Sequence, residues 1–235
     1  MKGHIMRLPH TLALAAALVT LMPSAVHAQA SETSRTVSGG GISVPGWTGK
    51  IDASEEAKGQ TLNNAKLSKE GDALHVTTGP AVTYWNPANK ASGDYTVKAT
   101  FLEPKFMELN SHPHSYGIFI GGNNMGTDTM SLVYCAAYGD GNAFVRGFGP
   151  AVFNQLRSQP FPSVNKAAGV GQPVKQEIAW TVKGGKAECS INGAVIASFT
   201  KDQLVAPGKL TSLDGVYGLR FTHNVEAIVT GFGKS

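Results

Sequence analysis

The chain has 235 residues, a formal net charge of +4 and only 15% charged residues. Its Lys and Arg residues are scattered singly rather than gathered in a stripe, which argues against nucleic acid as a partner despite a sequence pI of about 9.0. The low charge and the 28 glycines are typical of a turn-rich β protein rather than a helical one.

Residues 1–28 have the features of a secretory signal peptide. Lys2 and Arg7 give a basic start, an apolar run extends from Thr11 to Met22, and Val26-His27-Ala28 supplies small residues at a cleavage site. The apolar run is shorter than the roughly 20 residues that a spanning helix needs. We therefore expect a periplasmic or secreted protein with no membrane span after cleavage, and an uncleaved anchor is the alternative.

The remaining chain shows the pattern of one β domain. Residues 29–45 are rich in Ser, Thr and Gly without periodicity, which predicts a disordered leader before a single sandwich domain over residues 46–235. A short helix is expected near 54–66 and a long loop over 149–172. Short apolar runs predict strands at 73–78, 82–85, 95–101, 115–120, 130–138, 143–148, 174–183, 186–191, 194–199, 216–222 and 225–232. Strands of this number and spacing predict an all-β fold of two packed antiparallel sheets.

Cys135 and Cys189 are the two cysteines of the chain, and each lies inside an expected strand. Export would bring them into an oxidising compartment, where a disulfide forms if their strands are neighbours in space. A pair of buried, inert thiols is the alternative. The sequence does not decide between the two.

Two stretches of the chain resemble the concanavalin A-like, laminin-G-type jelly roll. The last third reads VKQEIAWTVKGGKAECSINGAVIASFT and then GVYGLRFTHNVEAIVTGF, a strand-turn-strand ending in NG before a G-x-x-G-L-R strand and a closing strand. Earlier, GDYTVKATF followed by SYGIFIGG is similar to the strand order of that superfamily. The resemblance spans roughly Trp47 to Phe232 and implies a jelly-roll sandwich. Within the superfamily, the chain is similar to secreted 3-keto-disaccharide hydrolase-like domains, which implies glycan chemistry.

A sugar site needs a flat aromatic surface and amide or guanidinium donors. Arg146 and Arg220 stand among apolar residues of expected strands, where an unpaired guanidinium would be costly, so each must meet an acid, reach solvent or line a wet sheet face. An arginine that merely covers an exposed sheet face is the alternative. The candidate ligand-binding residues are Trp85, Tyr116, Asn123, Arg146, Arg220 and His223.

The sequence His112-Pro113-His114 is the most unusual local feature. In a hydrolase similar to the keto-sugar family, His112 or His114 would act as a general base. The same imidazoles could bind a metal if folding added Asp128, Asp140 or His223 as ligands. An exposed loop with incidental histidines is the alternative.

The Gly-rich loop over 121–129 suggests calcium as a second cofactor hypothesis. Asn123, Asn124 and Asp128 supply the oxygen donors that calcium prefers. A plain connecting loop is the alternative, because Gly and Asn also serve turns.

Several enzyme classes lack their signatures in this chain. A glycosidase needs two carboxylates at the scissile bond, and every strand acid is expected on a solvent face: Glu103, Glu177, Glu188 and Glu226. No G-x-S-x-G elbow, phosphate loop, dinucleotide fingerprint or C-x-x-C pair occurs. We therefore expect an exported β-sandwich that binds a carbohydrate or similar polar ligand on a concave sheet face. The alternatives are a glycan-processing hydrolase and a non-catalytic envelope interaction module.

Overall fold

The computed structural model describes residues 1, 3, 33–109 and 111–235. The expected signal peptide therefore lies outside the described residues, apart from positions 1 and 3. Glu32–Ser235 is one compact unit. Among the described residues, no helix has the length and apolar character required to span a membrane.

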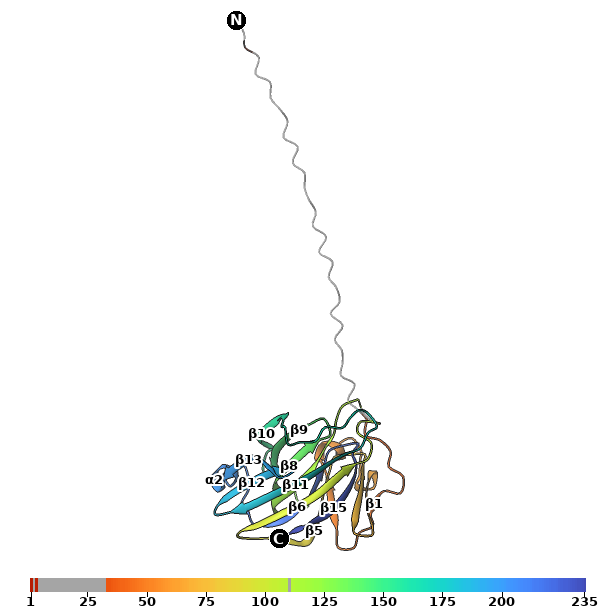
Figure 1. Cartoon of the computed structure of the whole chain (residues 1–235), viewed down its shortest axis with the longest axis vertical. Coiled ribbons are helices and arrows are strands. Elements are labelled where there is room, and N and C mark those ends of the chain that lie inside the picture. Colours follow the sequence, from red (N-terminus) through yellow and green to blue (C-terminus); the bar gives the residue numbers. More distant parts are fainter. Residues whose placement is uncertain (2, 4–32, 110) are drawn as a thin grey trace. The chain divides into compact units, whose positions relative to one another are not determined.

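Two packed β-sheets account for most of this unit (Figure 1). The eight-stranded sheet has the order β1 (Gly41–Ile42), β3 (Ala65–Glu70), β4 (Ala73–Thr78), β15 (Glu226–Lys234), β6 (Tyr95–Glu103), β11 (Val174–Lys183), β12 (Lys186–Ile191) and β13 (Ala194–Thr200). The seven-stranded sheet has the order β10 (Phe153–Pro160), β9 (Asn142–Phe148), β8 (Ser131–Tyr138), β7 (Ser115–Asn123), β14 (Gly215–Phe221), β5 (Val82–Ala91) and β2 (Thr48–Ile51). Neighbouring strands are antiparallel except for β1 and β3. The predicted two-sheet antiparallel sandwich is confirmed.

The burial patterns of β6 and β7 show that the outer face of one sheet is exposed to solvent whereas that of the other is covered. In β6, buried residues alternate with half-exposed or exposed ones, because one face meets the other sheet and one meets solvent. In β7, eight of nine residues are buried. The seven-stranded sheet is therefore covered on its outer face as well as in the core between the sheets.

Trp180 and a disulfide join the two sheets through the core. The Trp180 side chain is fully buried, and its indole N–H donates to the carbonyl of Ile118 in β7 at 3.0 Å. Cys189, which lies opposite Trp180 across the β11–β12 pair, is bonded to Cys135 of β8. Of the two alternatives for the cysteines, the structure shows the disulfide.

Two expected irregular segments are more regular in the structure. The expected loop over 149–172 contains β10, an edge strand whose mostly exposed, polar residues show no apolar alternation for the sequence to reveal. In place of one helix near 54–66 there are two short turns, α1 (Ala53–Glu56) and η1 (Leu62–Asn64). A further short helix, α2 (Lys201–Leu204), follows β13.

The end of the expected disordered leader is also ordered. Within residues 33–45, β1 pairs in parallel with β3. The Arg35 guanidinium donates to the carbonyls of Thr78 and Val225 at 2.9 and 2.5 Å. The structure contradicts the expected disorder for this part of the leader, because backbone pairing, the Arg35 hydrogen bonds and the packing of Ile42 and Val44 hold it against the sandwich.

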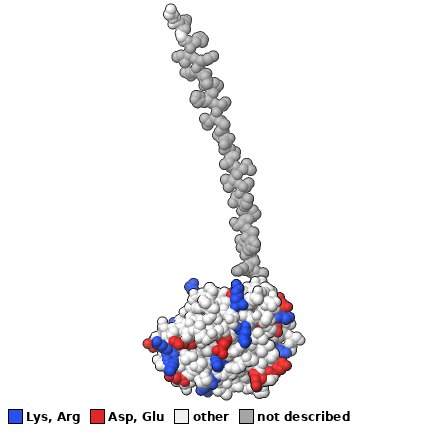
Figure 2. Space-filling view, in the orientation of Figure 1, with Lys and Arg blue, Asp and Glu red and all other residues white. Residues whose placement is uncertain are grey.

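Charged groups of both signs are interspersed on the face shown in Figure 2, where Lys and Arg lie among Asp and Glu. Ion pairs such as Lys105–Glu108, at 3.0 Å, form between neighbours on the surface. Exposed pairs of this kind contribute little to stability.

Candidate functional site

A second apolar cluster covers the outer face of the seven-stranded sheet. Its buried members are Trp85, Phe119, Leu132, Tyr134, Ala136, Phe144 and Val216. Partly buried Met125, Met130, Tyr138 and Phe148 pack against them. These side chains form an aromatic floor outside the main core, over which surface loops can enclose a ligand.

One row of opposed residues crosses this floor from β2 to β9. It runs Thr48, Trp85, Gly218, Phe119, Tyr134 and Arg146. A side chain at Gly218 would place its Cβ 2.5 Å from a ring carbon of Phe119. Only glycine therefore lets the Phe119 ring lie against the strand next to Trp85.

A groove of about 730 Å³ lies beside Trp85, and we call it the Trp85 groove. Its lining is Thr48–Ile51, Glu56, Gln60–Leu62, Trp85, Pro87 and Met125–Thr127. Trp85 and Met125 give it an apolar wall, and Gln60 belongs to a polar one. The Gln60 Oε1 atom is buried and has no hydrogen-bond partner among the described residues. The Gln60 residue is half-buried, so rotation of its amide would give this unsatisfied acceptor a partner in the groove.

Two further grooves adjoin the Trp85 groove. The Phe148 groove, of about 550 Å³, is lined by Lys50–Ser54, Thr127, Asp128, Met130, Phe148, Gly149 and Val152. The Asn123 groove, of about 410 Å³, is lined by Trp85, Pro87, Lys90, Gly122–Met125, Gly215 and Val216. Lys50 lines both the Trp85 groove and the Phe148 groove, and Trp85 lines both the Trp85 groove and the Asn123 groove. The three grooves therefore lie next to one another, and we call them together the trough.

Lys50 bridges the trough between strand β2 and the loop before β8. Its ammonium donates to the Thr127 carbonyl and pairs with the Asp128 carboxylate, each at 3.3 Å. Because the Asp128 side chain is exposed, this bridge can open at little cost when a ligand enters.

Arg220 fixes the chain that follows β2. Its two terminal nitrogens donate to the two carboxylate oxygens of Asp52 at 2.6 Å each. The guanidinium also lies over the rings of Phe148 and Tyr134, at 5.0 and 5.7 Å from their centroids. Arg220 is buried, so this bidentate pair holds the Asp52 segment against the aromatic floor beside the Phe148 groove.

The predicted ligand residues fall into different places. Trp85 lines two grooves, and Asn123 lines one while its amide donates to the Asp214 carbonyl at 3.1 Å. Arg220 pairs with the Asp52 carboxylate, so its two terminal nitrogens are already hydrogen-bonded within the protein. Arg146 has reached solvent on the same sheet face, where it lies over Phe144 and donates to the Asn154 side chain at 2.9 Å.

The predicted stacking role of Tyr116 is corrected by the structure. Its side chain is fully buried between the sheets and stacks on Phe101, with ring centroids 5.3 Å apart. Because β7 is buried on both faces, the sequence pattern could not show which of its residues point toward the core. Trp85 and Phe148, rather than Tyr116, are the aromatic residues that line the trough.

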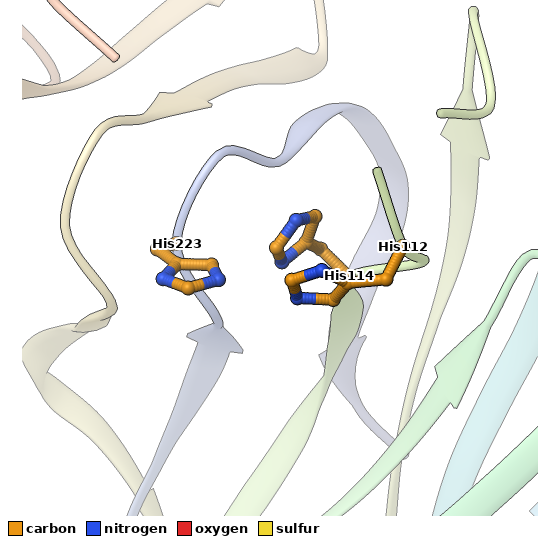
Figure 3. A group of neighbouring side chains, drawn as sticks. All are labelled: His112, His114 and His223. Atoms are coloured by element: carbon orange, nitrogen blue, oxygen red, sulfur yellow. The ribbon is translucent and has the colours of Figure 1, made fainter. Parts of the chain in front are cut away.

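His112, His114 and His223 lie together at the ends of β7 and β14 (Figure 3). Neither Asp128 nor Asp140, the expected carboxylate ligands, belongs to this group. Asp140 instead accepts hydrogen bonds from the backbone and side chain of Asn142 at 2.9 and 2.8 Å. Asp128, the carboxylate expected for calcium, pairs with Lys50. The carboxylates proposed as metal ligands are thus engaged elsewhere.

Glu103 is a buried acid that the sequence interpretation placed on a solvent face, and that expectation is wrong. It is in phase with Tyr95, Val97, Ala99 and Phe101, a signal present in the sequence. Its side chain lies against Gly139, and its Oε2 atom has no partner among the described residues. Burial raises the pKa of Glu103 from its ordinary value of 4.5 to about 7, although a hydrogen bond from the Met107 backbone opposes the shift.

This shift predicts a pH-dependent stability. As pH rises from 4.5 to 7 the unfolded chain ionises Glu103 while the folded chain keeps it protonated, so stability is lost across this range. Between about pH 4.5 and 8 we expect the wild type to lose roughly 3 kcal/mol more than Glu103→Gln. Urea unfolding at both pH values checks this, with exposed Glu177→Gln as the control. Parallel pH profiles for wild type and Glu103→Gln would contradict it.

No family model and no curated protein sequence matches this chain. Among solved structures, it is similar to a carbohydrate-binding module, CBM66, from Bacillus subtilis (8% identity, covering 83% of this chain and 98% of that chain, TM-score 0.53). A protein of unknown function with a galectin-like fold, from the same species, matches at 12% identity over 80% and 88% of the two chains (TM-score 0.53). An endo-beta-1,3-glucanase from Pyrococcus furiosus matches at 13% identity over 78% and 85% (TM-score 0.51). These likenesses confirm the expected two-sheet jelly-roll fold.

Proposed function

We propose that this protein is an exported carbohydrate-binding sandwich that holds a saccharide in the Trp85 groove and its neighbouring grooves. This proposal is carried by a groove of about 730 Å³ that is lined by Lys50 and the half-buried Gln60 beside the indole of Trp85. The disulfide and the features of residues 1–28 support export, because disulfides persist in oxidising compartments.

The chemistry of the trough suits a sugar better than a purely apolar ligand. A saccharide has an apolar ring face and a rim of hydroxyls, so it needs an aromatic surface beside hydrogen-bonding groups. Met125 and the 4% of Trp85 that is exposed lie on the apolar side of the Trp85 groove, and half-buried Phe148 lines the adjoining groove. Lys50, Gln60 and Thr127 are placed to supply hydrogen bonds. The likeness to a module named as carbohydrate-binding supports the same class of ligand.

Gln60→Leu should weaken saccharide binding about tenfold, because it removes one buried hydrogen bond to a ligand hydroxyl. A glycan array first identifies the sugar, and calorimetric titration then compares the wild type with Gln60→Leu. Gln159→Leu, at an exposed position of edge strand β10, is the matched control and should leave the affinity unchanged.

The same titrations distinguish the competing functions. Equal losses in Gln60→Leu and Gln159→Leu would contradict the groove assignment. Release of reducing sugar during the titration would indicate the hydrolase instead. Absence of any glycan ligand, together with recovery of a stable protein partner, would favour the envelope interaction module.

A further inference from the structure

Three histidines from two distant parts of the sequence converge at one end of the sandwich. His112 and His114 precede β7, and His223 follows β14, the strand paired with β7. Their rings lie 4.4 Å (His112–His114), 4.3 Å (His114–His223) and 5.8 Å (His112–His223) apart, measured between centroids. Figure 3 shows the three imidazoles grouped around one point.

The backbone beneath two of these histidines is fixed by a reciprocal hydrogen-bond pair. The Ser115 N–H donates to the Thr222 hydroxyl at 2.8 Å, and the Thr222 N–H donates to the Ser115 carbonyl at 3.0 Å. Ser115 directly follows His114, and Thr222 directly precedes His223. The spacing between these two imidazoles is therefore set by the sheet.

The residues on the other side of each histidine are also restrained. Asn224 adopts a left-handed conformation with φ 57°, and its side-chain oxygen accepts the Arg35 N–H at 2.8 Å. Pro113 restricts the backbone between His112 and His114. The Ser111 hydroxyl lies 3.4 Å from Nδ1 of His112, a contact of the kind that orients ligating imidazoles.

We propose that His112, His114 and His223 form a binding site for one divalent transition-metal ion. One candidate ligand atom from each ring lies within 4.8 Å of the others. Tetrahedral zinc with metal–nitrogen distances of about 2.1 Å needs nitrogens about 3.4 Å apart. Because all three imidazoles can turn about their side-chain bonds, small rotations of the exposed His112 and half-buried His223 would bring the nitrogens to this spacing.

The ligand set selects the class of metal. It contains imidazoles alone, and within the described part of the chain no carboxylate or thiolate belongs to the group. Imidazole ligands suit Zn²⁺, Cu²⁺ and Ni²⁺, whereas Ca²⁺ and Mg²⁺ prefer oxygen. His114 is buried, His223 is half-buried and His112 is exposed, so a bound ion would keep a coordination position toward solvent.

Zinc titration of the purified, chelator-treated protein, prepared without a polyhistidine tag, tests this site. Competition with a zinc indicator should show one equivalent bound. His112→Gln and His223→Gln should each weaken binding about tenfold or more, because each removes one of three ligands. His75→Gln is the matched control, since His75 lies on β4 and pairs with Glu70 outside the cluster.

Thermal unfolding of each variant separates loss of the site from loss of the fold. His112 is exposed, so His112→Gln should keep the wild-type melting temperature without zinc and lose the zinc-induced rise. The proposal is overturned if the wild type binds no zinc, if His112→Gln binds it as tightly, or if His75→Gln weakens it equally. Because saccharide binding is not measured, these outcomes are independent of the proposed function.

Discussion

Replacing Cys135 with alanine should lower the free energy of unfolding by about 4 kcal/mol, and Cys189→Ala should do the same. The disulfide joins residues 54 positions apart, and closing a loop of that length removes about this much conformational free energy from the unfolded chain. It also ties β8 of one sheet to β12 of the other. The double variant should be little worse than either single one, because the first substitution already breaks the bond.

Chemical denaturation with and without a reductant measures this effect. The wild type in reductant should become as unstable as the double alanine variant, whereas the variant should not respond to the reductant. If the wild type has the same free energy of unfolding with and without reductant, the disulfide does not stabilise the fold.

Removing Asp52 should destabilise the fold more than removing Arg220. Asp52→Ala leaves a guanidinium buried among aromatic rings without its counter-ion, a change that costs about 3–5 kcal/mol. Arg220→Met leaves Asp52, whose side chain is 29% exposed and can reach water, so we expect roughly half that loss. Asp52→Ala is expected to be the more destabilising change because Arg220, the partner that it leaves unpaired, is the more buried of the two.

Equilibrium unfolding of both variants and of the double variant Asp52→Ala/Arg220→Met gives the coupling energy of the pair. Asp128→Ala is the matched control, because it breaks an exposed ion pair with Lys50 and should cost less than 1 kcal/mol. A larger loss for Arg220→Met than for Asp52→Ala would contradict the account of this site.

Most strands could be predicted from the sequence because their residues meet the core on one face. The pattern in β6, for example, alternates along the whole strand. Edge strand β10 could not be found this way, since none of its residues is fully buried. The two-residue β1 is held by backbone pairing and by the packing of Ile42, a pattern too short to predict a strand.

The candidate site could be predicted only in part. Because an unpaired buried guanidinium is costly, the sequence predicts that Arg146 and Arg220 each meet an acid, reach solvent or line a wet sheet face. In the structure Arg220 pairs with Asp52, and Arg146 reaches solvent and donates to Asn154. The identity of Asp52 could not be predicted, because it lies 168 residues from Arg220. The grouping of His223 with His112 is likewise set by the β7–β14 pairing. Side chains distant in sequence are brought together by sheet order, which local patterns do not encode.

We expect a saccharide to bind in the Trp85 groove on the outer face of the seven-stranded sheet. Two-dimensional NMR spectra recorded during titration with the sugar found on the array test it most directly. The indole N–H of Trp85 and the backbone amides of Thr48–Ile51 and Met125–Asp128 should shift together and saturate at one affinity. Shifts confined to other surfaces, with the Trp85 indole signal unchanged, would contradict the claim.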